Sequence, residues 1–269
     1  MPIAALAGTS MGGLVAAAYA ANPDAELLAR TAQRFGSVRQ MLELLDWFPA
    51  HGALVSSHRL ERLLRNLLGL ERGFDALQIP LALTAVDLAS DSLVTIQEGS
   101  VLEAVRATIA IPGVFSPVIR SGAHLVDGGI LNNLPVEALP LMGVQATIAV
   151  DVGFQLGEQP VDHQLPWLRS LPEPAGELYH AVALMMTEMT RARLREHPPD
   201  LLLEPDIPSG VGILTGFPRV AEIIAAGERA AMEAMPEIRR LRLWSAKRWW
   251  RALQPSPRPA RSPAGRRSA

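Results

Sequence analysis

The stretch Gly8-Thr9-Ser10-Met11-Gly12-Gly13 decides the fold, because it lies between an apolar run and an alanine-rich segment. The run 2–7 is expected to form a short buried strand, and 14–21 is expected to form a helix. A serine flanked by glycines at such a junction is typical of a nucleophile elbow. The glycines permit a turn too tight for side chains, and this turn raises the hydroxyl above the sheet edge. The first amides of the helix would then point at a developing oxyanion.

A second motif, Asp127-Gly128-Gly129, follows a short apolar run. The run 124–126 is expected to be a strand, and α/β folds place functional groups at the carboxyl ends of strands. An aspartate at such an end, followed by two flexible residues, is therefore a candidate catalytic group. The alternative is an Asx-turn, in which the carboxylate only binds its own backbone.

Helical patterns alternate with short apolar runs along the chain, which favours α/β layering with a largely parallel sheet. Further strands are expected at 81–86, 93–96, 146–150 and 201–203, and helices at 25–34, 37–47, 57–68, 101–110, 177–195 and 220–243. The turn Asn22-Pro23-Asp24 is a helix N-cap signal. From Gln254 the Pro, Ser, Arg and Ala composition predicts disorder. These patterns divide the chain into a domain at 1–243 and a basic tail at 244–269.

Composition narrows the class of protein. A chain of 269 residues with 49% hydrophobic content can bury a sizeable core. The absence of cysteine excludes disulfides, thiolate zinc sites and a cysteine nucleophile, and it fits a reducing compartment. The sequence contains no apolar segment of membrane-spanning length, and its start lacks the features of a signal peptide. We therefore expect a cytoplasmic protein, or a chain whose true beginning is absent.

The net charge of −2 conceals an asymmetry between body and tail. The segment 239–269 holds ten of the 25 basic residues and no acid, so the body is acidic. An acidic body without a recognition motif argues against a nucleic-acid partner. In the tail, Trp244, Trp249 and Trp250 lie among lysine and arginine, a composition suited to peripheral contact with a membrane surface. The alternative is a helix end whose tryptophans pack on the body.

Other catalytic chemistries have weaker support. A conventional α/β-hydrolase triad needs a histidine late in the chain, and three follow Asp127, namely His163, His180 and His197. None has a recognisable catalytic setting. His124 lies near Asp127 in the sequence and is a candidate to tune it, although packing explains it as well. Three scattered carboxylates lack metal-ligand spacing and are explained by solvation or capping: Asp87, Asp91 and Asp151.

With these two motifs in order, and a proline-containing loop at 110–117 between them, the sequence resembles the patatin-like phospholipase family over roughly 3–236. The resemblance implies a three-layer α/β/α fold with a mostly parallel central sheet. It also implies a Ser–Asp dyad without histidine, in which Ser10 is the nucleophile and Asp127 the general base. Phospholipids or other lipid esters would be cleaved through an acyl-serine, without a metal or organic cofactor.

The resemblance gives the neighbouring residues supporting roles. Gly8 and Gly12 would shape the elbow, the Met11 amide would bind the oxyanion, and Gly128 and Gly129 would support the second motif. The loop at 110–117 would wall an apolar acyl pocket. A free carboxylate has a pKa of about 4 and is a weak base. We therefore expect the aspartate to lie in a partly dry cleft that raises its pKa.

One family feature is missing from this sequence. Family members carry a glycine-rich loop with an arginine on their first strand, well before the serine, and this loop forms most of the oxyanion hole. Only nine residues precede Ser10. We expect the first strand to be absent, as in an incomplete version of a longer protein, which would expose a strand edge to another chain. The alternative is a degenerate member with little activity that acts as a lipid- or protein-binding module.

Overall fold

The structure is a computed structural model, and it describes residues 2–35, 61, 62, 64, 65, 71–112, 114–153, 173–208, 211 and 217–242. For 173–180 it describes the backbone alone. The helix expected at 37–47 and the tail at 244–269 lie outside these residues. Of the helix expected at 57–68, four residues are described, and they are helical.

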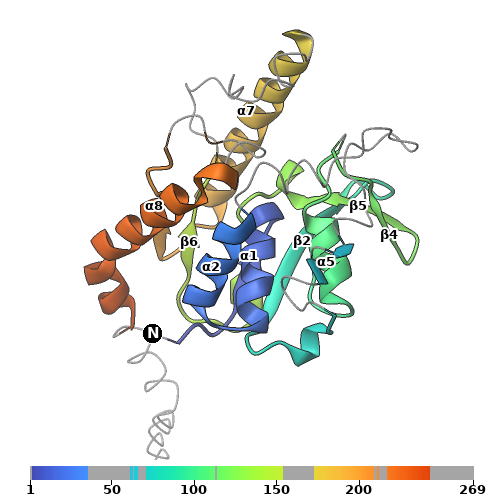
Figure 1. Cartoon of the computed structure of the whole chain (residues 1–269). Helices are drawn as coiled ribbons and strands as arrows, with labels where there is room; N and C mark the ends of the chain where they lie inside the picture. Colours follow the sequence, from blue (N-terminus) through green and yellow to red (C-terminus); the bar gives the residue numbers. More distant parts are fainter. Residues whose placement is uncertain are drawn as a thin grey trace, which may run out of the picture.

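Short strands alternate with helices, as the sequence patterns predict (Figure 1). The strands are β1 (Leu6–Gly8), β2 (Leu81–Asp87), β3 (Ser92–Ile96), β4 (Val118–Arg120), β5 (Ala123–Asp127), β6 (Ile148–Val150) and β7 (Leu201–Leu203). The α-helices are α1 (Ser10–Ala21), α2 (Ala25–Phe35), α5 (Val101–Thr108), α6 (Ala138–Leu141), α7 (Glu173–Glu196) and α8 (Val220–Glu233). Single 3-10 turns form η1 (Phe74–Ala76), η2 (Gly128–Ile130) and η4 (Phe217–Arg219). The strand β4 is not expected from the sequence.

The central sheet is built around β2, whose seven residues are all buried. β1 pairs with β2 in parallel, whereas β3 and β5 pair with β2 antiparallel and β4 pairs with β5 antiparallel. A separate parallel pair joins β6 to β7. The described strands thus form a mixed sheet rather than a mostly parallel one, because β2–β3 and β4–β5 are hairpins. Their turns use the left-handed backbone conformation at Asp91 and at Ser121-Gly122.

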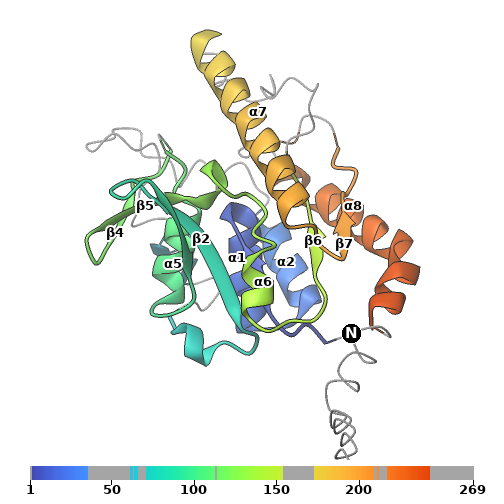
Figure 2. The same cartoon turned by 180° about the vertical axis from the view of Figure 1, so that it is seen from behind.

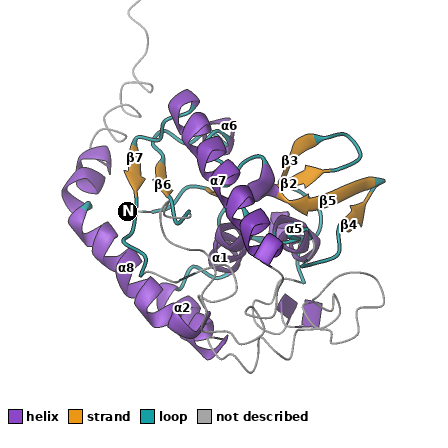
Figure 3. Ribbon diagram, turned by 90° about the horizontal axis from the view of Figure 1, so that it is seen from above, coloured by secondary structure: helices purple, strands orange, loops and turns teal. Residues whose placement is uncertain are grey.

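Helices cover both faces of the sheet, which confirms the three-layer α/β/α fold. α1 and α5 pack together on one face, while α6 and α7 lie on the other, as the views from behind and from above show (Figures 2 and 3). α2 contacts both α1 and α8. The core lies between α1, α5 and β2, where Ala17, Leu83 and Val105 are fully buried. The alanines of α1 let this helix approach the sheet closely.

Sequence signals explain the start of α2 and the end of α8. The N-cap signal before α2 is confirmed, because the Leu27 amide donates to Asp24 Oδ1 at 2.9 Å. The single helix expected at 220–243 is instead interrupted at Ala234 and resumes at 235–242. Pro236 explains the break, since it has no N–H and its ring crowds the preceding turn.

The described helices differ from membrane-spanning helices in length or in hydropathy. None of them is both long enough and apolar enough to cross a membrane.

Candidate functional site

The ends of β1 and β5 meet on one edge of β2. Gly8, at the end of β1, pairs with Leu83, and Asp127, at the end of β5, pairs with Ala85. β3 pairs with the same two β2 residues and therefore occupies the opposite edge. Because β1 runs parallel to β2 and β5 runs antiparallel, the two strands approach each other end to end. Ser10 and Asp127, 117 positions apart in the chain, are brought together in this way.

The two groups are directly hydrogen-bonded. Ser10 Oγ donates to Asp127 Oδ2 at 2.6 Å, and the Gly129 amide donates to Asp127 Oδ1 at 2.8 Å. The aspartate is only 5% exposed. This burial raises the pKa of Asp127 to about 6, although the hydrogen bonds from Ser10 and Gly129 oppose the rise. The carboxylate is therefore a stronger base than a solvated aspartate and is still largely ionised at pH 7.

The serine lies on a sharp turn. Its φ of 54° is in the left-handed region, which residues other than glycine and asparagine rarely adopt. A Cβ on Gly8 would lie 2.7 Å from the Cα and N of Gly13, so strand and helix touch through their backbones. A Cβ on Gly12 would meet nothing within 4 Å. Backbone crowding therefore requires glycine at Gly8 and not at Gly12.

The amides at the start of α1 have different surroundings. The Ser10 amide donates to Thr108 Oγ1 at 2.9 Å, so this donor is already occupied. The Met11 amide belongs to the first turn of α1, where helical geometry provides no acceptor. That the Met11 amide binds the oxyanion stays a prediction. Thr108, at the end of α5, was not identified from the sequence, because nothing in its local pattern marks it.

The second motif is packed as tightly as the elbow. A Cβ on Gly128 would lie 2.6 Å from the Thr84 carbonyl oxygen, a backbone atom of β2. A Cβ on Gly129 would lie 2.8 Å from Met186 Cε, at the end of a flexible side chain of α7. Glycine is thus required by the backbone at Gly128, whereas Gly129 contacts a side chain that is able to move.

A hydrogen-bond network links the elbow, the second motif and α7. Thr9 Oγ1 donates to the Asn132 carbonyl at 2.9 Å and accepts from Thr84 Oγ1 at 2.5 Å. Asn132 Nδ2 donates to Glu137 Oε1 at 2.6 Å, and Arg193 Nη1 donates to the same oxygen at 3.0 Å. Arg193 Nε also donates to the Leu131 carbonyl, in the loop after the second motif, at 2.7 Å. The loop that follows the aspartate is therefore held by the elbow on one side and by α7 on the other.

The loop at 110–117 supports the aspartate through its backbone. The Asp127 amide donates to the Ala110 carbonyl at 3.0 Å, and Val114 and Phe115 pack against the core. Two apolar residues near Ser10 and Asp127 in the chain are exposed, namely Met11, which is 45% exposed, and Ile130, which is 37% exposed. That the loop walls an acyl pocket stays a prediction.

No hydrogen bond joins the other described candidates to the side chain of Ser10 or Asp127. His124 lies on β5 with an exposed side chain, and its amide donates to Asp87 Oδ1 at 2.8 Å. The hydrogen bonds from Ser90, Ala89 and His124 lower the pKa of Asp87, which thus holds a hairpin turn. His197 is exposed beyond α7. The described part of the chain contains no group of three or more residues able to hold a metal ion. His163 and the side chain of His180 lie outside the described residues.

Comparison with known proteins places the chain in a family. The family model described as patatin-like phospholipase matches residues 2–140. An uncharacterized NTE family protein of Mycobacterium tuberculosis is 31% identical over 257 residues, covering 86% of this chain and 42% of the relative. The mouse patatin-like phospholipase domain-containing protein 6 is 27% identical over 159 residues, covering 58% of this chain and 12% of the relative. The chain thus spans less than half the length of these relatives, and it belongs to the patatin-like phospholipase family.

Proposed function

We propose that this chain is a lipid acyl hydrolase that cleaves carboxylic esters through Ser10 and Asp127. The observation that carries the proposal is the 2.6 Å hydrogen bond from the Ser10 hydroxyl to a buried carboxylate. A serine hydroxyl is a poor nucleophile until a base within hydrogen-bond reach takes its proton. Burial gives Asp127 a pKa of about 6, close to the range in which a general base works best at neutral pH.

The reaction follows from these positions. Asp127 takes the hydroxyl proton as Ser10 Oγ attacks the ester carbonyl carbon, and the Met11 amide hydrogen-bonds the resulting oxyanion. The tetrahedral species collapses to an acyl-serine, and the leaving alcohol takes the proton back from Asp127. Water then attacks the acyl-serine with Asp127 again as base, releasing the fatty acid and restoring the hydroxyl.

The surface beside the dyad suits an apolar substrate. Met11 follows Ser10 in the chain and Ile130 lies three residues after Asp127, and both expose apolar side chains. An acyl chain lying on them would remove apolar surface from water. Family membership supports lipid esters as the substrate class. Both observations favour lipid esters over small polar esters.

A serine-directed fluorophosphonate probe tests the proposal. We expect the probe to label the wild-type chain and to leave Ser10→Ala unlabelled, because the probe bonds covalently to an activated serine oxygen. Ser92→Ala is the matched control, since Ser92 is exposed on β3. Mass spectrometry of the labelled peptide locates the modified residue.

Two results would decide against the hydrolase. Folded wild-type protein that takes no label would favour the alternative, a degenerate family member that binds lipid or protein. Label found on a serine other than Ser10 would reject the assigned nucleophile.

The pH dependence of the reaction follows from the same carboxylate. Asp127 acts as base only when ionised, and its pKa is about 6. We expect kcat/KM for a water-soluble ester to rise with pH, to reach half its maximum near pH 6, and to fall about tenfold per unit well below that. A profile that is flat between pH 5 and 7 would contradict the role of Asp127 as base.

A further inference from the structure

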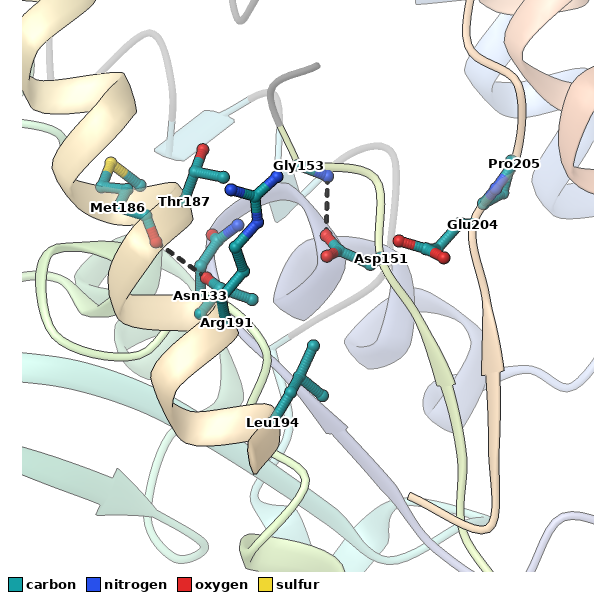
Figure 4. Close-up of a pocket in the computed structure, with 10 residues that line it drawn as sticks. Asn133, Asp151, Gly153, Met186, Thr187, Arg191, Leu194, Glu204 and Pro205 are labelled. Carbon is teal, nitrogen blue, oxygen red and sulfur yellow. Dashed lines mark hydrogen bonds between the residues drawn. The ribbon is translucent and has the colours of Figure 1, made fainter. Parts of the chain in front are cut away.

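A pocket of about 210 Å³ lies beside the second motif and outside the dyad. Its walls come from α7, from the loop after the second motif, and from the ends of β6 and β7 (Figure 4). Six of its lining residues carry the argument: Asn133, Asp151, Met186, Thr190, Arg191 and Glu204.

One residue separates this pocket from the catalytic carboxylate. Asn133 and Met186 line the pocket, and both contact Gly129, where a Cβ would lie 3.1 Å from Asn133 Oδ1 and 2.8 Å from Met186 Cε. The Gly129 amide in turn donates to Asp127. A group held in the pocket would therefore lie next to an ester bound at Ser10.

The pocket carries charges of both signs. Arg191 lines the pocket from α7, and Asp151 and Glu204 line it from the opposite side, at the ends of β6 and β7 (Figure 4). One Asp151 oxygen accepts the Gly153 amide at 2.8 Å. Arg191 donates to Glu188 at 2.7 Å, but both side chains of that pair are about half exposed, so it holds the guanidinium only weakly. A guanidinium is suited to a phosphate, and two carboxylates are suited to a cation.

The hydrogen-bond acceptors decide which cation fits. Thr190 Oγ1 donates its hydrogen to the Met186 carbonyl at 2.9 Å, so its lone pairs are left for a donor in the pocket. With the two carboxylates, this gives a set of acceptors for N–H groups. Aromatic side chains, which enclose quaternary ammonium ions, are absent from the described lining. A primary ammonium therefore fits better than a trimethylammonium.

We propose that this pocket binds the phosphoethanolamine head group of a lipid ester, with Arg191 at the phosphate and Glu204 and Asp151 at the ammonium. This assignment rests on the proposed function, because it names the substrate class of the same site. It predicts a preference for phosphatidylethanolamine over phosphatidylcholine with identical acyl chains.

Two substitutions separate the two ends of the head group. In mixed micelles, we expect wild type to prefer phosphatidylethanolamine in kcat/KM by about tenfold. Glu204→Gln should remove most of this preference, because it weakens only the ammonium contact. Arg191→Gln should lower kcat/KM for both lipids alike, since the phosphate is common to them. Glu196→Gln, exposed at the end of α7 and outside the pocket, is the control and should change neither.

Direct binding keeps this inference apart from the hydrolase proposal. Calorimetry with Ser10→Ala should detect binding of glycerophosphoethanolamine and much weaker binding of glycerophosphocholine. Equal binding of the two, or a lipid preference that Glu204→Gln leaves intact, would overturn the head-group assignment. If the selective binding is seen while wild type takes no fluorophosphonate label, the pocket assignment stands and the hydrolase proposal fails.

Discussion

Asp127→Asn should lower ester turnover by about 100- to 10,000-fold, the range that a positioned general base contributes. The amide has nearly the shape of the carboxylate and still accepts the Gly129 amide, but it is unable to take the Ser10 proton. Steady-state hydrolysis of a water-soluble ester at pH 7 measures the loss. The same variant should take up the fluorophosphonate probe far more slowly than wild type.

The same substitution should make the protein more stable. Folding raises the pKa of Asp127 from about 4 to about 6, so the folded state disfavours the ionised carboxylate. The native protein therefore binds more protons than the unfolded chain between these values, and wild-type stability falls as pH rises through this window. Asp127→Asn removes this cost, by about 2–3 kcal/mol at pH 7 and by little at pH 4. Urea unfolding at the two pH values measures the difference.

Asp91→Asn provides the matched control for this experiment. Asp91 is exposed in the β2–β3 turn with a φ of 51°, a conformation that asparagine tolerates well. The Asp91→Asn substitution should change neither ester turnover nor the pH dependence of stability. An Asp127→Asn variant that is less stable than wild type at pH 7 would show that burial of the ionised carboxylate does not lower the free energy of unfolding.

Gly8→Ala should be the most destabilising small substitution in the elbow. The added methyl group would lie 2.7 Å from backbone atoms of Gly13, which move only if α1 shifts away from β1. Overpacking of this kind costs about 3 kcal/mol or more, and a shift of α1 also moves Ser10 away from Asp127. We expect the melting temperature to fall by roughly 6–12 °C, together with a loss of fluorophosphonate labelling.

Gly12→Ala adds the same methyl group four residues further on. Here nothing lies within 4 Å, and alanine favours the helix by up to about 1 kcal/mol. The melting temperature should therefore stay the same or rise slightly in differential scanning calorimetry. Equal melting temperatures for the two variants would contradict the close approach of β1 and α1.

Local patterns in the sequence predicted much of the fold. The strand at 201–203 has the expected bounds, and the two glycine motifs mark the two ends that meet on β2. Each motif is a run of consecutive residues, so it can be recognised in a single sequence. The break at Ala234 is also predictable from the sequence, because Pro236 disfavours a continuous helix there despite the apolar stripe.

The supporting residues were not predicted, and distance along the chain explains why. Thr108 holds an amide 98 positions away, and Arg193 reaches a carbonyl 62 positions away. Such contacts depend on how elements pack and leave no periodic pattern. The sequence predicts that Asp127 lies in a partly dry cleft and has a raised pKa. It does not predict the hydrogen bonds from Ser10 and Gly129 that oppose this rise, because they form only once the loop is folded.

The pairing of β1 and β5 with one edge of β2 has a consequence for sequence change in this protein. Side chains alternate between the two faces of a strand, so a one-residue slip of β5 along β2 would turn Asp127 to the wrong side of the sheet. Asp87 opposes such a slip, because its carboxylate accepts the His124 amide at 2.8 Å. Insertions or deletions should therefore be accepted at the exposed hairpin tip Ser121-Gly122 and rejected between His124 and Asp127.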